Sequence, residues 1–300
     1  MHFPRQSAFL TAVPSIYQPW DLQHLHLPEF FTPEARESRE RTYRAFAAQA
    51  ELVVVASGWI KDDVCAQYGL SPDRVAVVNP PPVTVAYTPP TADESARIAA
   101  QLGLPPRFAF YPAQPWGHKN HERLLEALRL LRDRGLDVAL VCTGHRNARY
   151  PEVMARAADL GVESQVTFLG YLSPAEVQVV YQRAELMVFP SMYEGWGLPI
   201  LEAFAADLPV ACSKVTSLPA LVGDAALVFD PMDVAAIAAA IERLWLDEAL
   251  RATLVERGRR RVGAFDWDRT ARLLRAHYRR VAGRPLDAAD RELLLEPALV

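Results

Sequence analysis

One short stretch, Phe189–Ala205 (FPSMYEGWGLPILEAFA), carries the residues with the clearest potential for chemistry. An apolar run ends at Phe189, a loop bracketed by glycines follows, and Pro199 stands where proline favours the first turn of a helix. Glu194 in the loop and Glu202 in the helix can each accept hydrogen bonds from a vicinal diol. Between them, the start of the helix offers unpaired N–H groups and a partial positive charge. The stretch therefore predicts an anion site flanked by two sites for hydroxyl groups.

The two glycines of this loop, Gly195 and Gly197, would let the main chain approach a ligand closely, because they lack a Cβ. A nucleotide sugar has a matching layout, with its pyrophosphate between the diol of a hexose and the diol of a ribose. Taken alone, Glu194 and Glu202 would better fit a solvated pair beside the start of a helix than a binding site. Their combination with both glycines and Pro199 favours a nucleotide-sugar site.

The elements that must position this loop follow a regular pattern from about residue 107. Short apolar runs alternate with segments of helical spacing, which predicts a parallel sheet covered by helices on both faces. Ligands of such sheets bind beyond the carboxyl ends of the strands, where the loop lies. The predicted strands are Phe108–Tyr111, Val138–Cys142, Val166–Leu169, Leu186–Phe189, Val210–Cys212 and Leu227–Phe229, and the predicted helices include His118–Arg134 and Pro151–Leu160.

The N-terminal third shows the same alternation over fewer elements. The segment 79–90 holds five prolines and predicts a stiff extended connection, so we place a domain boundary near residue 92. The region Val234–Arg280 predicts three consecutive helices. The expected domains are a partial N-terminal domain over 1–92, a nucleotide-sugar-binding domain over 93–265, a helix over 266–282, and a tail over 283–300. The elements expected before the boundary are Glu34–Ala50, Leu52–Ala56, Trp59–Tyr68 and Val75–Val78.

Composition narrows the class of protein. Of the 300 residues, 51% are apolar and 23% are charged, which is typical of a globular chain and excludes a wholly disordered one. The net charge of −4 provides no general field for nucleic acid. Three widely spaced cysteines favour a reducing compartment, and the longest charge-free stretch, Val75–Ala92, carries five prolines and cannot form a membrane helix. We therefore expect a soluble, cytoplasmic chain.

The glutamate stretch, Phe189–Ala205, resembles a signature of the retaining nucleotide-sugar glycosyltransferases of family 4. In that signature, Glu-Gly-Phe/Trp-Gly-Leu-Pro is followed by a second Glu-Ala. Tyr111–His121 (YPAQPWGHKNH) is similar to the strand-end motif that supplies a lysine to the donor phosphates in that family. The resemblance extends from about residue 14 to residue 280. Its other parts are DLQHLH (21–26), VVVASGWIKDDV (53–64), FLGYLS (168–173), SLPALVGDAALVFDP (217–231) and FDW (265–267).

The resemblance implies an α/β fold of the GT-B type, with two Rossmann-like doubly wound domains of which the N-terminal one is incomplete. It implies that the domain over 1–92 is on the acceptor side and that the helix over 266–282 packs back toward it. It implies transfer of a mannose- or glucose-like hexose, with retention of configuration, from a nucleotide-diphosphate sugar to a glycan or lipid-linked glycan. The nucleotide sugar would be a co-substrate, and neither a further cofactor nor a metal is expected. No nucleic acid is expected as a partner.

The resemblance also implies roles for individual residues. Lys119 would bind the diphosphate, Glu202 the ribose hydroxyls, and Glu194 the donor hexose. The residues assigned to catalysis are Glu194, Lys119 and Asp21. Those assigned to donor binding are Glu202, Gln114, Gly144 at the end of a neighbouring strand, Tyr171 and Leu172 at the base, Leu198 through its N–H to the phosphate, and Gly195, Trp196 and Gly197 through their backbone.

Two other sets of residues have alternative readings. His24 with His26, and His118 with His121, could be metal pairs, but no third ligand has zinc-site spacing, which favours packing or substrate contact. A basic run could meet anionic lipid headgroups as a peripheral membrane contact, or it could form a solvated helical face. This run consists of Arg257, Arg259, Arg260 and Arg261, with Arg279 and Arg280 further on.

The sequence leaves two other functions open: a nucleotide-sugar-binding chain with weak or no activity, and a related epimerase. The first glycine is Gly58, and about three strands precede the boundary, fewer than a complete doubly wound domain needs. We therefore expect the chain to be short at its N-terminus, with an apolar sheet edge through which copies could self-associate. A smaller but complete acceptor domain is the alternative.

Overall fold

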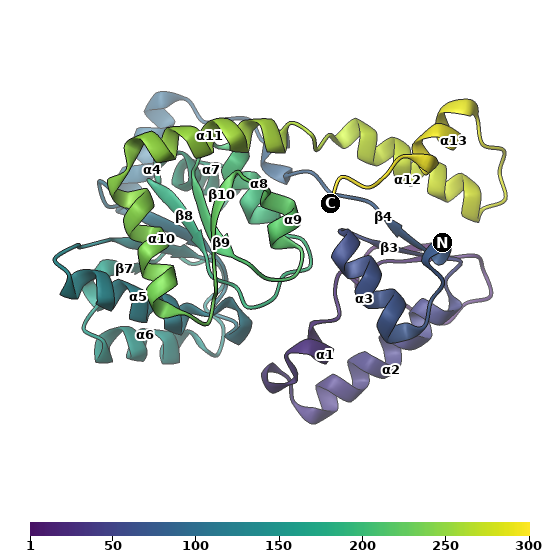
Figure 1. The fold of residues 1–300 in the computed structure, drawn as a ribbon, viewed down its shortest axis with the longest axis horizontal. Helices are drawn as coiled ribbons and strands as arrows, with labels where there is room; N and C mark the ends of the chain where they lie inside the picture. The colour runs from purple at the N-terminus through teal and green to yellow at the C-terminus, as the bar shows by residue number, and fades with distance from the viewer. The chain divides into compact units, whose positions relative to one another are not determined.

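The computed structural model describes residues 1–300, which form two compact units, each built around a parallel sheet (Figure 1). The N-terminal unit comprises Met1–Pro81, Tyr193–Trp196 and Ala264–Val300. The C-terminal unit comprises Pro82–Met192 and Gly197–Gly263. The first change of unit along the chain thus falls between residues 81 and 82, whereas the sequence placed the boundary near 92.

The C-terminal unit contains a six-stranded sheet in the order β10-β9-β8-β5-β6-β7, and all its strand pairs are parallel. The chain enters at β5, adds β6 and β7 on one side, and returns to add β8, β9 and β10 on the other side. The direction of winding therefore reverses between β5 and β8, which defines the switch point of a doubly wound sheet. The strands are β5 (Ala109–Pro112), β6 (Leu140–Thr143), β7 (Val166–Phe168), β8 (Leu186–Phe189), β9 (Val210–Ser213) and β10 (Ala226–Phe229).

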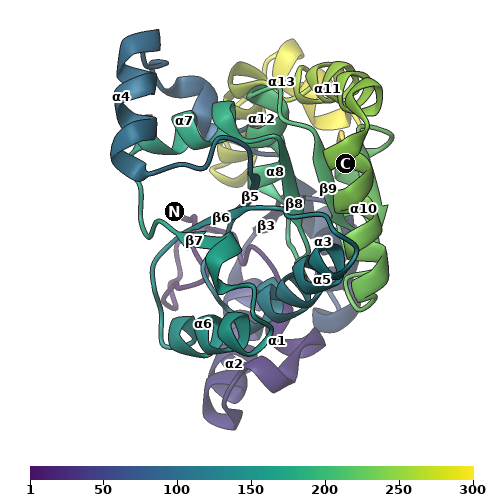
Figure 2. The ribbon, with the colours of Figure 1, turned by 90° about the vertical axis from the view of Figure 1, so that its left-hand side faces the viewer.

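Helices cover both faces of this sheet, which explains why its strands are continuous apolar runs (Figure 2). One face packs against α5 (His121–Asp133), α6 (Tyr150–Asp159) and α10 (Val234–Leu246). The other packs against α7 (Pro174–Arg183) and α8 (Leu198–Ala205), with α4 (Ala92–Leu102) on α7 and α11 (Glu248–Val262) on α8. The short α9 (Leu218–Val222) connects β9 to β10, and the 3₁₀ turns of this unit are η3 (Val83–Ala86), η4 (Gly117–Lys119) and η5 (Glu163–Gln165).

The N-terminal unit contains a four-stranded parallel sheet in the order β1-β2-β3-β4. Both faces are covered, because alternate residues of β3 belong to two different apolar clusters: Val53 and Val55 pack with α2 and α3, and Leu52 and Val54 pack with α12 and α13. The strands are β1 (His2–Phe3), β2 (Ile16–Tyr17), β3 (Leu52–Val55) and β4 (Val75–Val77). The helices are α1 (Gln23–His26), α2 (Pro33–Gln49), α3 (Gly58–Tyr68), α12 (Trp267–Val281) and α13 (Ala288–Leu295), with 3₁₀ turns η1 (Pro28–Phe30) and η2 (Pro72–Arg74).

The basic run of α11 is largely occupied by contacts within the chain. Arg259 makes a bidentate ion pair with Asp207, and Arg257 approaches Asp224 at 3.5 Å. Arg261 donates to the carbonyl oxygen of Leu221 at 2.6 Å. These contacts connect α11 to α9 itself and to the segments that follow α8 and α9. No helix of the chain has both the length and the apolar character needed to cross a membrane.

Candidate functional site

Lys119 lies at the switch point of the C-terminal sheet. It ends the turn η4, which follows β5, and its ammonium nitrogen is 5.5 Å from the centre of the Phe189 ring, at the end of β8. The hydroxyl of Tyr111, in β5, donates a 2.6 Å hydrogen bond to the carbonyl oxygen of Lys119. The ends of β5 and β8 therefore fix the backbone of the lysine where ligands of doubly wound sheets bind.

The turn that carries Lys119 is bonded to the loop after β8. Asn120 adopts a left-handed backbone conformation, and its side-chain amide donates to the carbonyl oxygens of Pro190 at 3.0 Å and Pro231 at 2.7 Å. The N–H of Met192 donates to the carbonyl oxygen of His118 at 2.7 Å. These bonds between loops that are distant in the sequence make the turn a rigid support for the lysine.

His121 is a packing residue in the structure. It is 4% exposed, its ring stacks on Phe168 with centroids 5.7 Å apart, and burial lowers its pKa to about 3. A neutral ring among aromatic neighbours agrees with the packing interpretation of His121. In the whole chain, no three side chains of His, Cys, Asp or Glu gather as a metal site would require.

Gly197 precedes α8 and has a backbone φ of +101°, which strongly favours glycine. A Cβ here would lie 2.7 Å from Leu218 Cδ2 and 3.0 Å from Leu221 Cδ2, both in α9. The close approach of α9 thus gives a packing reason for this glycine, whereas the sequence pattern had suggested ligand approach. Helix α8 begins at Leu198, one residue before the expected Pro199.

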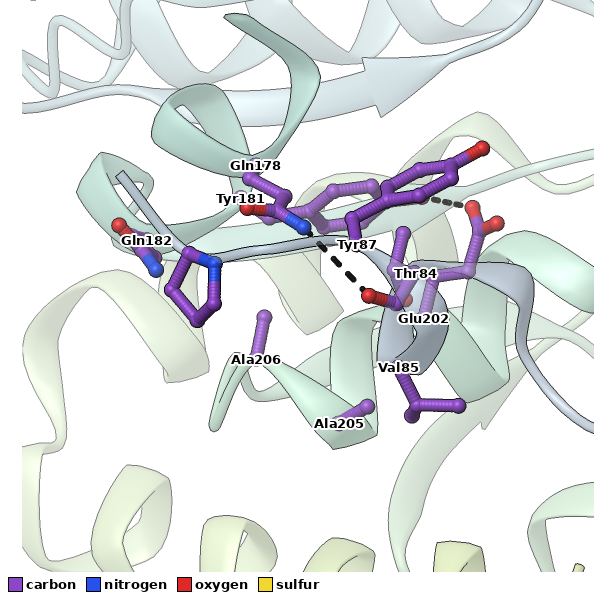
Figure 3. Close-up of a pocket in the computed structure, with 10 residues that line it drawn as sticks. Thr84, Val85, Tyr87, Gln178, Tyr181, Gln182, Glu202, Ala205 and Ala206 are labelled. Carbon is purple, nitrogen blue, oxygen red and sulfur yellow. Dashed lines mark hydrogen bonds between the residues drawn. The ribbon is translucent and has the colours of Figure 1, made fainter. Parts of the chain in front are cut away.

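Glu202, in α8, is held by a hydrogen bond from Tyr181, in α7, whose hydroxyl lies 2.9 Å from Oε2 (Figure 3). Burial raises the pKa of Glu202, and the bond from Tyr181 partly opposes this. The carboxylate lines a pocket of about 200 Å³. The other walls come from η3, the segment after it, α7 and the end of α8, through Thr84, Val85, Tyr87, Pro89, Gln178, Tyr181, Gln182, Ala205 and Ala206.

A second pocket of about 200 Å³ adjoins the first, since Tyr87 lines both. Gly144, Tyr171 and Leu172, which the resemblance assigned to donor binding, line this second pocket. The Tyr171 side chain is 72% exposed, and its ring stacks on His145 with centroids 5.0 Å apart and planes 14° apart. The pocket therefore offers an accessible aromatic surface that a planar ring could contact.

Gln114 and Gly144 lie against each other at the ends of the neighbouring strands β5 and β6. Gly144 has a φ of +116°, and a Cβ on it would lie 2.8 Å from the Gln114 backbone nitrogen and 2.9 Å from Gln114 Cγ. No larger residue fits at position 144 without moving Gln114. The structure thus brings two of the predicted donor residues together at the sheet edge.

The remaining predicted residues belong to the N-terminal unit, where Gly195 lies beside Asp21. A Cβ on Gly195 would lie 2.8 Å from the Trp20 carbonyl oxygen and 3.3 Å from Asp21 Cβ. Ser57 Oγ donates to the Gly195 carbonyl oxygen at 3.1 Å. Trp20 itself has a φ of +70°, an uncommon conformation for a bulky residue that is often found near functional sites.

The side chain of Trp196 serves packing within the N-terminal unit. It is 4% exposed, its indole N–H donates to the Pro80 carbonyl oxygen at 2.9 Å, and its ring packs edge-on against Phe265. Tyr193, three residues earlier, stacks on His26, whose Nε2 lies 2.8 Å from Asp63 Oδ1. Packing on both sides therefore holds the loop that contains Glu194.

The predicted site residues thus divide between the two units. The C-terminal unit holds Lys119, Glu202, Gln114, Gly144, Tyr171, Leu172, Gly197 and Leu198, and the N-terminal unit holds Asp21, Glu194, Gly195 and Trp196. Tyr181 and Tyr87 were not predicted as site residues from the sequence. Tyr181 lies on the buried face of an amphipathic helix and Tyr87 in a proline-rich segment, so neither position carries a local signal for a site.

Comparison with known proteins supplies the family. The model for "Glycosyl transferases group 1" matches residues 94–261. The O-antigen chain mannosyltransferase B of Escherichia coli is 30% identical over 251 residues, which cover 83% of this chain and 65% of the relative. The chain therefore spans just under two thirds of the length of that curated relative.

Solved structures show the same fold. Sucrose-phosphate synthase from Thermosynechococcus elongatus matches with a TM-score of 0.75 at 24% identity, over 90% of this chain and 68% of that one. Anabaena HepE, solved in complex with UDP and glucose, also matches with a TM-score of 0.75, at 20% identity over 88% of this chain and 71% of that one. The chain has the GT-B fold with Rossmann-like α/β units and belongs to the glycosyl transferases group 1 family.

Proposed function

We propose that the chain is a hexosyltransferase that uses a nucleotide-diphosphate sugar as donor and a glycan or lipid-linked glycan as acceptor. The observation that supports this most is the arrangement in the C-terminal unit of two adjoining pockets and a lysine at the switch point. One pocket presents the exposed ring of Tyr171, and the other presents the carboxylate of Glu202. Lys119 supplies the positive charge at the ends of β5 and β8.

The donor would bind along these features in the order of its chemical groups. We assign the base to the pocket of Tyr171 and Leu172, because a planar ring can stack on an aromatic face. We assign the ribose hydroxyls to Glu202, whose carboxylate can accept two hydrogen bonds from a diol. The diphosphate would then meet Lys119 and the N–H of Leu198, where the partial positive charge of α8 favours an anion.

We assign the hexose to Glu194 and to the backbone of the loop that follows it. Asp21, which approaches Gly195, would be the second carboxylate at the reacting sugar. In the reaction, the bond between the anomeric carbon and the diphosphate oxygen breaks, and the acceptor hydroxyl forms the new glycosidic bond and gives its proton to an oxygen of the leaving diphosphate. Lys119 and the start of α8 would stabilise the negative charge on the leaving diphosphate. We infer retention of configuration from the resemblance of the glutamate stretch.

The relatives support the class of donor and product. One is named for transferring mannose to the O-antigen chain, and the Anabaena structure holds UDP and glucose. We infer from these names a hexose donor and a role in polysaccharide synthesis. Because a lysine and a helix terminus can supply the positive charge at the phosphates, we propose that the reaction needs no divalent metal.

The basic run of α11 does not enter this proposal. Arg257, Arg259 and Arg261 are bonded within the chain, which leaves little of the run for a membrane contact. The proposed donor site is compatible with either a lipid-linked glycan or a soluble glycan as acceptor.

Donor screening would test the proposed function. We expect one series among UDP-, GDP- and ADP-sugars to raise the melting temperature, since a ligand at about 100 times its dissociation constant stabilises by about 2.7 kcal/mol. The shift should persist in EDTA, and the stabilising donor should support transfer of labelled sugar to a glycan. Donor binding without transfer would favour the inactive binding chain, conversion of the donor to another nucleotide sugar would favour the epimerase, and the absence of any shift would reject the donor site.

A further inference from the structure

The N-terminal unit holds a cavity of about 420 Å³ that has no part in the proposed donor site. It lies along β4, an outer strand of the sheet, whose residues Val75, Ala76 and Val77 line it. Helix α3 contributes Lys61, and α12 contributes a wall that includes Arg269, His277 and Arg280; α13 and the segment after it close the remaining side. A cavity of this size suits a small ligand.

The charged groups of the cavity leave two cations without an ion-pair partner. Lys61, Arg269 and Arg280 line it together with Asp73 and Glu296. Arg269 pairs with Glu296 at 2.8 Å, so these two charges offset each other. Lys61 and Arg280 form no ion pair within 4 Å, although both line the same cavity. The net charge of the remaining charged side chains, Lys61, Arg280 and Asp73, is therefore positive.

His277 adds an unsatisfied polar group to the cavity. The residue is 5% exposed, and its Nδ1 has no hydrogen-bond partner. Burial, with a contribution from Arg280, lowers its pKa to about 4, so the ring is neutral at pH 7. A buried ring nitrogen without a partner costs free energy, which a ligand that supplies a hydrogen bond would recover.

We propose that this cavity is a binding site for a phosphate-bearing ligand, with Lys61 and Arg280 as its charge partners and His277 as its hydrogen-bond partner. A phosphate group suits two separated cations and a neutral donor, because its several oxygens accept hydrogen bonds in different directions. Leu273, Leu293 and Leu294 line the same cavity and offer apolar contact to the rest of such a ligand. The phosphate can belong to a soluble metabolite or to a lipid headgroup. The inference does not depend on the proposed function.

Calorimetric titration of the full chain with inorganic pyrophosphate tests the charge partners. The test variant is Lys61→Gln/Arg280→Gln, and the matched control is Arg272→Gln/Arg284→Gln, which also removes two positive charges but lies outside the cavity wall. We expect the test variant to bind about tenfold more weakly than the wild type, equivalent to about 1.4 kcal/mol, and the control to bind as the wild type does. Equal affinities in the two variants would overturn the proposal.

Neither variant changes Lys119 or α8, so pyrophosphate bound at the proposed donor site contributes equally to both titrations. The outcome is therefore independent of whether the donor site is correct. A second readout follows the imidazole resonances of His277, which the His277→Gln variant assigns. They should shift on titration in the wild type and in the control, and remain unchanged in the test variant. An unchanged His277 resonance in the wild type would also overturn the site.

Sedimentation with phosphatidylcholine vesicles, with or without phosphatidic acid, distinguishes the two sources of phosphate. Binding to the acidic vesicles that the test variant loses and the control keeps would assign the site to a lipid headgroup. Pyrophosphate binding without vesicle binding would assign it to a soluble ligand. If the test variant and the control lose vesicle binding equally, the general surface charge is responsible, and the cavity is not a lipid site.

Discussion

The hydroxyl of Tyr181 donates a 2.9 Å hydrogen bond to Oε2 of Glu202 and thereby joins α7 to α8 at the wall of a pocket. Tyr181 is 2% exposed, and burial beside the carboxylate raises its pKa well above the ordinary range. The phenol therefore stays protonated and acts as a donor toward Glu202. With one carboxylate oxygen fixed in this way, the other is available to a ligand in a defined orientation.

The Tyr181→Phe variant should weaken nucleotide binding while leaving the fold intact. A hydrogen bond to a charged group contributes about 1.5–3 kcal/mol, and part of this loss should appear as a raised KM for the donor with kcat little changed. Tyr150→Phe, which alters a tyrosine of α6 outside both pockets, is the control. A donor KM equal to that of the wild type would show that Tyr181 does not position Glu202.

The Glu202→Gln variant should become more stable relative to the wild type as the pH rises. Burial raises the pKa of Glu202 above its ordinary value of 4.5, so the folded state holds this proton more tightly than the unfolded state. Ionisation of the wild type therefore costs stability as the pH rises from about 4.5 through the raised pKa, whereas glutamine cannot ionise. Melting temperatures of both proteins across this range measure the difference, and a difference that does not change with pH would contradict the assignment.

The Gly197→Ala variant should destabilise the C-terminal unit through packing as well as backbone strain. The added Cβ would meet Leu218 at 2.7 Å, and overpacking of this kind costs about 1–3 kcal/mol in addition to the strain of a positive φ. Gly135→Ala is the control, because Gly135 also has a positive φ but a Cβ on it would meet no other atom within 4 Å. If urea denaturation shows the same loss of unfolding free energy in both variants, α9 moves at little cost and packing does not require this glycine.

Elements with strong apolar patterns could be predicted from the sequence. The run Leu186–Phe189 has the bounds of β8, because four buried residues between two helices leave little ambiguity. Within the predicted helix His118–Arg134, the leucines that recur at helical spacing are all buried in α5: Leu124, Leu125, Leu128 and Leu131. The predicted second strand of this unit began two residues early, at Val138, whereas β6 begins at Leu140.

Other elements carried too little signal. The strands β1 and β2 have two residues each, and an interval that short shows no periodicity. Helix α13 lies in the segment taken as a tail, and its Leu293 and Leu294 pack against the sheet, an interaction that depends on distant residues. Helix α4 was missed after the proline-rich segment, although Thr91 and Glu94 form a capping box at its start.

The candidate site likewise contains some residues that could be predicted from the sequence and others that could not. The motifs singled out Lys119 and Glu202, since their neighbours in the sequence define a strand end and a helix start. The bond from Tyr181 joins two residues that are 21 positions apart, and Tyr87 reaches the pocket from another segment of the chain. Such partners are set by tertiary packing, which no local pattern reports.

The most direct test of the central claim is calorimetric titration of the Lys119→Ala and Glu202→Ala variants with the nucleotide sugar identified by donor screening. The controls are Arg134→Ala and Glu242→Ala, which alter a residue just after α5 and a residue of α10 whose side chains meet at 3.1 Å outside both pockets. We predict that each site variant binds the donor at least about tenfold more weakly, a loss of about 1.4 kcal/mol or more, and that both controls bind as the wild type does. Wild-type donor affinity in Lys119→Ala and Glu202→Ala would contradict the proposed donor site.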